Sequence, residues 1–226
     1  KRYVQWNDRA DVLAQAFWPG ALTLVLKRKV DSAIADLVSA GGDTIAIRVP
    51  RHPLAQALLR AFDGGIAAPS ANRSGRISPT TAAHVRAEFG DAMPLIVDGG
   101  ACEVGLESTV VDVSGDVPEL LRPGSITRAM IEEMLKDNLT PTLSLTDGEG
   151  GIRASGRVNI LKSPGQLEKH YAPNLPLRLN AQEVKTDEAL VAFGASPLKG
   201  AAHSINLSPT ANLIEPFPNE WSGEAI

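Results

Sequence analysis

Residues 22–26, LTLVL, predict the strand around which the fold is built. The segment is apolar or β-branched throughout, which is typical of a strand that is buried on both faces of a sheet. The three basic residues that follow, KRK at 27–29, indicate that the chain leaves the core there. The sequence therefore predicts a buried strand that ends at residue 26.

Helices and strands alternate on both sides of this segment. Asn7 or Asp8 can cap a first helix, which ends at Trp18-Pro19-Gly20. Further helices are predicted over residues 31–39, 53–62 and 81–89 and, capped by Ser125, over 126–135. Further strands are predicted over residues 44–49, 66–68, 95–97, 109–113 and 118–121. This alternation favours a mixed α/β sheet with helices packed against it.

The periodic pattern ends after residue 136. The next residues are rich in Thr, Pro, Gly, Asp and Ser, which is typical of a linker. The linker continues into SPGQLEKHYAP at 163–173, where Lys169, His170 and Tyr171 offer more functional groups than a passive tether needs, although a linker packed on a domain surface explains them as well. Apolar segments at 177–179 and 190–193 predict strands of a smaller α/β unit. The predicted organisation is a main domain at 1–136, a linker at 137–174 and a second domain at 175–226.

Composition excludes several classes of protein. Of the 226 residues, 43% are hydrophobic and 4% are aromatic, which fits an α/β protein with an aliphatic core. No apolar run approaches the roughly 20 residues that a membrane span needs, so no membrane partner is predicted. The single cysteine, Cys102, excludes an internal disulfide and a cysteine-rich zinc site and favours a cytoplasmic setting. A net charge of −4 argues against nucleic-acid binding over the whole surface.

A polar loop is predicted within IAAPSANRSGRISPT at 66–80, which leaves an apolar run and continues with small hydroxyl and amide side chains. Its neutral donors and its positive charges come from Ser70, Asn72, Ser78, Arg73 and Arg76. Such a loop is suited to holding an anion. A polar connection that ends at the cap of the next helix is the alternative, because these are also ordinary turn residues.

Polar side chains also lie at the ends of other predicted strands. Arg48 stands in the otherwise apolar strand at 44–49, on the same face as Thr44. A position at the edge of the sheet explains this arginine, and so does a cavity wall in which its guanidinium receives a carboxylate. Ser108, in GLESTVVD, begins a strand, and Arg122, in LLRPGSIT, ends one. Each is ordinary alone, but together they mark strand ends, where α/β sheets commonly place ligands.

The motifs that the sequence contains and lacks narrow the class of reaction that it can support. The sequence contains no Walker A loop, no G-x-G-x-x-G and no zinc pattern, and Ser70 lacks the G-x-S-x-G setting of a nucleophile. Positive and neutral donors without an obvious general base remain, and they suit a reaction in which a nucleotide phosphate is held. The predicted reaction class is an adenylyl transfer with Mg²⁺ bridging the phosphates, without a nucleophilic side chain or a dedicated protein metal site.

Seven segments carry a family resemblance, and they are FWPGALTLVLKRK, DTIAIRVPRHPLA, IAAPSANRSGRISPT, LIVDGG, GLESTVVD, LLRPGSIT and SPGQLEKHYAP. In order and approximate spacing they resemble the Sua5 branch of the Sua5/YrdC/YwlC family, from about Phe17 to Leu179. A chain that contains both the SANxSG loop and the HYAP segment resembles the two-domain Sua5 type. The resemblance implies a YrdC-like twisted mixed sheet with flanking helices, followed by a linker and a smaller Rossmann-like Sua5 domain.

Members of this branch are threonylcarbamoyl-AMP synthases. The resemblance implies that ATP, L-threonine and bicarbonate give threonylcarbamoyl-adenylate and pyrophosphate, the first step of the threonylcarbamoyl modification of adenosine 37 in tRNA. It also implies downstream threonylcarbamoyl-transfer proteins and tRNA as partners. The residues that match the family's ATP-binding positions are Thr44, Ser70, Asn72, Ser78, Arg122 and Tyr171. Those that match its threonine-binding positions are Arg48, Ala68 and Ser108.

The chain departs from the family pattern at both ends. The family's PTETVYGL-like opening and its K-x-R loop have no counterpart, which implies an N-terminally incomplete first domain. Near the other end LSPTANLIE runs directly into PFPNEWSGEAI, which implies an incomplete second domain. A non-catalytic module that binds double-stranded RNA is the alternative from a different class, because relatives of this fold present a concave basic surface. The acidic net charge counts against it.

Overall fold

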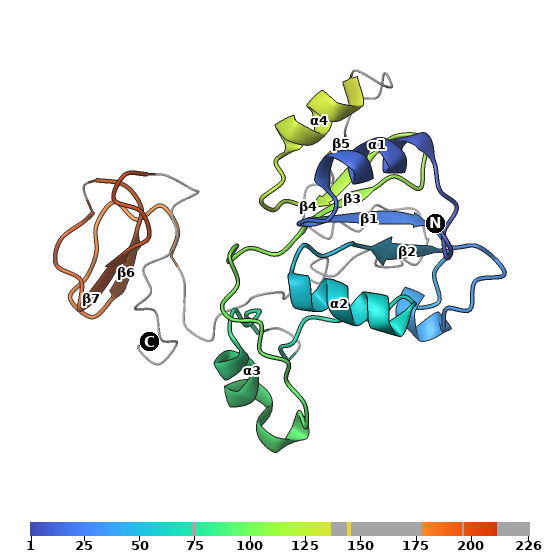
Figure 1. Ribbon diagram of the computed structural model, residues 1–226. Helices are drawn as coiled ribbons and strands as arrows, with labels where there is room; N and C mark the ends of the chain where they lie inside the picture. The colour runs from blue at the N-terminus through green and yellow to red at the C-terminus, as the bar shows by residue number, and fades with distance from the viewer. Residues whose placement is uncertain (74–75, 137–143, 146–177, 196, 212–226) are drawn as a thin grey trace. The chain divides into compact units, whose positions relative to one another are not determined.

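The computed structural model describes residues 1–73, 76–136, 144–145, 178–195 and 197–211, which belong to two compact units (Figure 1). The first unit contains a five-stranded sheet in the order β2-β1-β3-β4-β5, and the second contains the pair β6-β7. The strands are β1 (Leu22–Lys27), β2 (Thr44–Ile47), β3 (Thr109–Asp112), β4 (Glu119–Arg122), β5 (Ser144–Leu145), β6 (Ala189–Ala192) and β7 (His203–Asn206).

Strand β1 lies inside the first sheet and is buried as its sequence predicts. It pairs antiparallel with β2 and parallel with β3, and β3 pairs antiparallel with β4. The fully buried side chains of this strand are Leu22, Leu24, Val25 and Leu26. Both faces of β1 therefore lie in the core, and the combination of parallel and antiparallel neighbours confirms the predicted mixed sheet.

Two helices pack together over this sheet. α1 (Asp8–Phe17) buries Leu13, and α4 (Arg128–Lys136) buries Leu135 in the same hydrophobic cluster. The two helices contact each other, and Figure 1 shows both above β1. Their apolar faces close one side of the sheet, which fits the predicted arrangement of helices against strands.

The start of α1 is fixed by Asn7, one of the two predicted caps. Its Oδ1 accepts the backbone N–H of Ala10 at 2.9 Å, as an N-cap does. Its Nδ2 donates to the carbonyl of Val113 at 2.8 Å. One side chain therefore caps the helix and ties its first turn to the end of β3.

Helices α2 (Pro53–Phe62) and α3 (Ala82–Phe89) form where the sequence predicts them. His52 and Thr81 cap them, through acceptance of a backbone N–H by each side chain at 3.3 and 3.2 Å. Unlike α1, α2 buries none of its residues completely, and Phe62 is 62% exposed. None of the described helices has the length and apolar character that crossing a lipid bilayer requires.

Two predicted strands, at 66–68 and 95–97, are wrong. Neither segment pairs with a described strand, and Ile66, Leu95 and Val97 are exposed. A strand forms only where a neighbour accepts and donates its backbone hydrogen bonds, and no described strand lies in register with these segments. Their apolar composition indicates a propensity to form strands. That propensity does not reveal whether a neighbouring strand exists to pair with them.

Two predicted element bounds also need correction. The helix predicted over 31–39 is only a 3₁₀ turn, η1 (Asp36–Ser39), which ends where predicted because Ala40 takes a left-handed φ of 49°, whereas residues 31–35 form no helix. The strand predicted over 44–49 ends at Ile47, so Arg48 follows β2 and does not lie inside it. A second 3₁₀ turn, η2 (Gly90–Ala92), directly follows α3.

The second unit is built on a parallel pair of strands. β6 and β7 pair with Leu190 opposite Ser204, and β6 is the strand predicted at 190–193, displaced by one residue. β7 escapes prediction because His203 and Ser204 interrupt the apolar pattern. Of the strand predicted at 177–179, residue 177 lies outside the described residues and the other two form no strand.

Glu188 precedes β6 and organises the chain before it. Its Oε2 accepts the backbone N–H of Lys185 at 2.8 Å and a guanidinium N–H of Arg178 at 2.6 Å. These hydrogen bonds, that of Lys185 first, lower the pKa of the Glu188 carboxyl from its ordinary value because they favour the charged form.

Candidate functional site

Arg122 and Glu107 form the charged centre of the site, at the end of β4 and just before β3. Nη1 of Arg122 pairs with Oε2 of Glu107. Nε donates to the carbonyl of Ser108 at 3.0 Å, and Nη2 donates to the Ser108 hydroxyl at 3.1 Å. The arginine and glutamate side chains are 18% and 24% exposed, so water screens this pair less than a surface pair. Contacts from all three nitrogens fix the plane of the guanidinium.

Two more hydroxyl groups join this centre. Ser78 Oγ donates to Oε1 of Glu107 at 2.6 Å, and the hydroxyls of Ser108 and Thr23 lie 2.7 Å apart. We call the connected residues the arginine cluster, and they are Thr23, Ser78, Glu107, Ser108 and Arg122. The cluster links β1, the start of β3, the end of β4 and the segment before α3.

The arginine cluster brings together three of the residues singled out from the sequence, Ser78, Ser108 and Arg122. It also contains Glu107 and Thr23, which sequence reasoning missed. Each had a signal: Glu107 precedes Ser108 in the same motif, and Thr23 is the polar residue of the buried LTLVL segment. A polar residue in a buried strand needs a hydrogen-bond partner, and here the partner is another site residue.

A tight turn after β4 positions Arg122. The buried Thr109 side chain donates to the carbonyl of Ile126 at 2.7 Å and accepts its N–H at 3.1 Å. A Cβ on Gly124 would lie 2.6 Å from the carbonyl oxygen of Glu107 and from the nitrogen of Thr109, so the turn needs glycine. The turn thereby holds β4 against the residues that precede β3.

This turn also corrects the predicted start of the last helix in the first unit. Because Thr109 binds both backbone groups of Ile126, that residue stays outside the helix, and α4 begins at Arg128. The predicted cap, Ser125, is too early in the chain for this start. Thr127 takes the role, and its Oγ1 accepts the N–H of Met130 at 3.3 Å.

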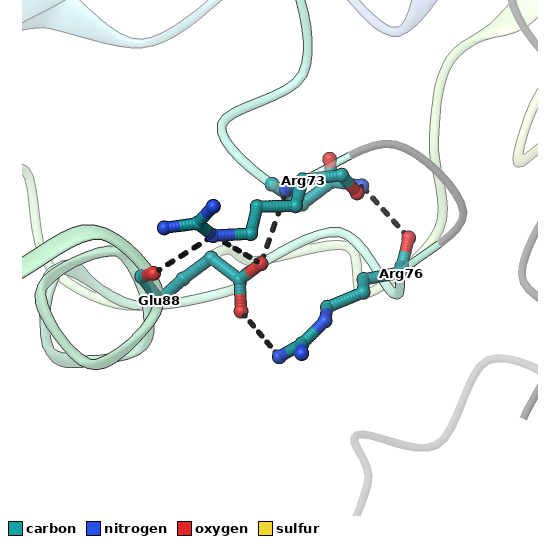
Figure 2. Close-up of polar contacts among 4 residues, drawn as sticks. Arg73, Arg76 and Glu88 are labelled. Atoms are coloured by element: carbon teal, nitrogen blue, oxygen red, sulfur yellow. Dashed lines mark hydrogen bonds and ion pairs between the residues drawn. The ribbon is translucent and has the colours of Figure 1, made fainter. Parts of the chain in front are cut away.

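The predicted anion loop is braced by Asn72. Its Nδ2 donates to the carbonyls of Arg73 and Arg76, at 3.1 and 2.7 Å. Its Oδ1 is buried and accepts no hydrogen bond from the described residues. Both arginines contact Glu88 of α3, as Figure 2 shows. Ser70, two residues before the brace, is exposed.

Thr44 and Arg48 lie at opposite ends of β2. Thr44 pairs with Lys27, the last residue of β1, and so lies away from Thr23 of the arginine cluster. Arg48 follows β2, and its Nε donates to the carbonyl of Gly20 at 2.8 Å. Among the described strands β2 is at the edge of the sheet, but Arg48 follows this strand, so the edge position does not decide between the two interpretations of Arg48. The carboxylate contact of Arg48 stays a prediction.

The remaining predicted site residues are not part of the arginine cluster. Ala68 is exposed in the segment between α2 and α3. Tyr171 lies outside the described residues. Where the chain is described, no group of three or more His, Cys, Asp or Glu side chains is arranged to hold a metal ion.

Two protein-family models match the chain. The model of the Sua5/YciO/YrdC family, described as telomere recombination, matches residues 1–124. The chain belongs to the Sua5/YciO/YrdC family. The family match includes every residue of the arginine cluster. A second model, described as the C-terminal domain of threonylcarbamoyl-AMP synthase, matches residues 126–214.

Two curated members of the family are similar to most of the chain. The threonylcarbamoyl-AMP synthase of Bacillus subtilis is 44% identical over 172 residues, which are 76% of this chain and 46% of the relative. That of Pyrococcus abyssi is 39% identical over 170 residues, 74% of this chain and 46% of the relative. The chain thus spans about half the length of these relatives.

Two solved structures share the fold. The crystal structure of P. abyssi Sua5 complexed with L-threonine matches with a TM-score of 0.70 and 29% identity, over 92% of this chain and 62% of the other. The structure of a P. abyssi Sua5 double variant matches with a TM-score of 0.63 and 32% identity, over 86% of this chain and 50% of the other. These similarities support the α/β architecture of the family.

The turn after β4 generates a prediction about Gly124. We expect Gly124→Ala to lower the free energy of unfolding by about 1–3 kcal/mol, because the new methyl group overlaps backbone atoms of Glu107 and Thr109. Gly115→Ala is the matched control, since a Cβ there would lie 4.0 Å from the carbonyl oxygen of Val117, its nearest neighbour among the described residues. Urea denaturation followed by tryptophan fluorescence measures both. Equal stability of the two variants would contradict the described turn.

Proposed function

We propose that the chain carries the activity of an L-threonylcarbamoyladenylate synthase, a nucleotidyltransferase that forms threonylcarbamoyl-AMP for tRNA modification. The observation that supports this most is the arginine cluster. Three residues that match ligand-binding positions of the family come from separate segments and are joined through one carboxylate and one guanidinium. The names of relatives at 39% and 44% identity support the same activity.

The proposed ligand contacts follow the family's motif positions. ATP is assigned to Thr44, Ser70, Asn72, Ser78, Arg122 and Tyr171. L-threonine is assigned to Arg48, Ala68 and Ser108. The described residues accept one N–H from each nitrogen of Arg122, so each Nη nitrogen has a second N–H to offer a phosphate oxygen. For Asn72, a phosphate contact requires release of one of its two carbonyl partners.

The proposed reaction needs positioning more than side-chain chemistry. The threonine nitrogen forms a bond to the carbon of bicarbonate with loss of water, which gives a carbamate. A carbamate oxygen then attacks the α-phosphorus of ATP, and the bond to the pyrophosphate oxygen breaks. Negative charge shifts to the leaving pyrophosphate, so a fixed guanidinium such as that of Arg122 lowers the barrier if it lies beside the phosphates.

Mg²⁺ is proposed to accompany the nucleotide, where it would neutralise phosphate charge. A magnesium ion that is held mainly by substrate phosphates and water needs only one or two protein ligands. The described residues offer donors for the phosphates that would carry the ion, the two Nη nitrogens of Arg122 among them. None of them is assigned as a magnesium ligand.

The proposed setting is the cytoplasm, which suits the free and exposed thiol of Cys102. There the product would pass to threonylcarbamoyl-transfer proteins that act on tRNA, and contact with tRNA is part of the same proposal. The proposed domain organisation is a catalytic domain at 1–136, a linker at 137–174 and a Sua5-type domain at 175–226. The boundary near residue 125 between the two family models supports a division of the chain, although it lies earlier than 136.

Pyrophosphate release tests this function. We expect release that requires ATP, L-threonine and bicarbonate together, because the adenylyl acceptor exists only after threonine is carboxylated. The assay uses the full product of the reading frame that encodes these residues, with each substrate omitted in turn as a control. Absence of pyrophosphate from the folded protein would contradict the synthase function. Salt-sensitive binding of double-stranded RNA by that inactive protein would favour the RNA-binding alternative.

The proposed role of Arg48 gives a second test. We expect Arg48→Ala to weaken L-threonine binding at least about tenfold, the loss typical of a charge-assisted hydrogen bond, and to change ATP binding by less than about threefold. Arg60→Ala, which removes an exposed arginine of α2, is the matched control and should leave both affinities unchanged. Titration calorimetry with each ligand measures the split. Equal losses for both ligands would rule out the carboxylate role.

A further inference from the structure

We propose that Glu88 is a positioning residue, which holds the described parts of the loop, residues 70–73 and 76–78, in their binding conformation through Arg73 and Arg76. The loop carries three residues assigned to ATP, so the effect on ATP rests on the proposed function. The contact itself does not. Glu88 lies outside every motif that points to a ligand and was not predicted from the sequence.

A single carboxylate engages both arginines (Figure 2). Oε1 of Glu88 accepts the backbone N–H of Arg73 at 3.2 Å and lies 3.7 Å from its Nε. Oε2 accepts from Nη1 of Arg76 at 3.1 Å. The backbone carbonyl of Glu88 also faces Arg73 Nε, at 3.4 Å. Glu88 therefore contacts the loop at two points three residues apart.

Hydrogen bonds among residues 72, 73 and 76 also connect these two points. The backbone N–H of Arg76 donates to the carbonyl of Arg73 at 3.1 Å, and Asn72 bridges the carbonyls of both residues. The Arg73 guanidinium also lies over the ring of Phe89, 5.8 Å from its centroid. The last turn of α3 thus provides a carboxylate, a carbonyl and an aromatic ring to one loop.

Burial distinguishes Glu88 from an ordinary surface partner. Its side chain is 15% exposed, whereas those of Arg73 and Arg76 are 61% and 64% exposed. Removal of the carboxylate charge would leave two arginines near each other with less compensation, and their repulsion would weaken the contact between residues 73 and 76. The glutamate is the fixed member of the group, and the arginines are attached to it.

The position of Glu88 in its helix supports the same conclusion. A carboxylate in the last turn of a helix is unfavourable, because the C-terminal end of the helix dipole is negative. A residue that conflicts with its local structure is expected to have a compensating tertiary role. Here the compensation comes from the two loop arginines. We therefore infer that these arginines serve loop geometry, and that they are not the groups that bind phosphate.

The first experiment compares ATP and L-threonine binding by titration calorimetry. Glu88→Gln keeps an acceptor for the Arg73 N–H and removes the charge, and we expect it to weaken ATP binding about tenfold while threonine binding stays unchanged. Glu133→Gln, an exposed glutamate of α4, is the matched control and should bind both ligands as the natural protein does. Unchanged or tighter ATP binding by Glu88→Gln would overturn the proposal, since it would mean that released arginines are neutral or beneficial.

A double variant separates positioning from direct binding. If Arg76 acts only through Glu88, Arg76→Gln in the Glu88→Gln background should cause no further loss of ATP affinity. Losses that multiply would show that Arg76 has its own contact with ATP and would overturn the positioning role. The thermal unfolding midpoint of each variant is compared with that of the natural protein. Similar midpoints show that the binding data come from folded proteins.

A third measurement does not involve ATP and separates failure of this proposal from failure of the proposed function. Brief trypsin treatment of the folded protein, followed by mass spectrometry, reports cleavage after Arg76. We expect this cleavage to be several-fold faster in Glu88→Gln than in Glu133→Gln, because the trypsin-binding side chain is released. Equal rates would overturn the contact. If the natural protein binds no ATP, the proposed function fails and the positioning role for ATP fails with it, while the cleavage rates still decide whether Glu88 holds the loop.

Discussion

The parallel pairing of β1 with β3 is the constraint on which the candidate site depends. Leu22 pairs with Thr109, so both strands begin at the same end of the sheet, and the hydroxyls of Thr23 and Ser108 meet there. β4 runs antiparallel to β3 and must therefore finish at that same end, where Arg122 pairs with Val110. Because β1 and β3 are buried, few water molecules can replace the hydrogen bonds of this ladder. The position of the guanidinium thus follows from the packing of the core.

Two carboxylates hold the arginine side chains of the site and of the loop in place. Glu107 fixes Arg122 and Ser78, and Glu88 fixes the two loop arginines. Donors that are already oriented require little reorganisation when charge develops in a transition state, which is the main contribution a protein makes to phosphoryl and adenylyl transfer. The same carboxylates also restrict which N–H groups a phosphate can reach. In the proposed function, the site would select its ligand through the donors that its own glutamates leave available.

Local signals explain what could be predicted from the sequence, and topology explains the rest. The buried β1 and the cap Asn7 follow from neighbouring residues, and both are confirmed. Segments 66–68 and 95–97 have strand composition but no described pairing neighbour. Glu88 and Glu107 find their partners across 12 to 29 residues, a separation that no spacing rule covers. The arginine cluster also lies where the parallel strands β1 and β3 begin, whereas parallel sheets more often hold ligands where strands end.

A crystal structure of the protein with a non-hydrolysable ATP analogue and L-threonine would show where the nucleotide phosphates bind. They are proposed to bind at the end of the sheet where β1 and β3 begin. Our prediction is that phosphate oxygens lie within hydrogen-bonding distance, about 2.7–3.2 Å, of an Arg122 Nη nitrogen and of Ser78 Oγ, with the Ser78 hydroxyl turned from Glu107 to the phosphate and Glu107 still paired to the guanidinium. A nucleotide bound with its phosphates away from Arg122 and Ser78 would contradict it.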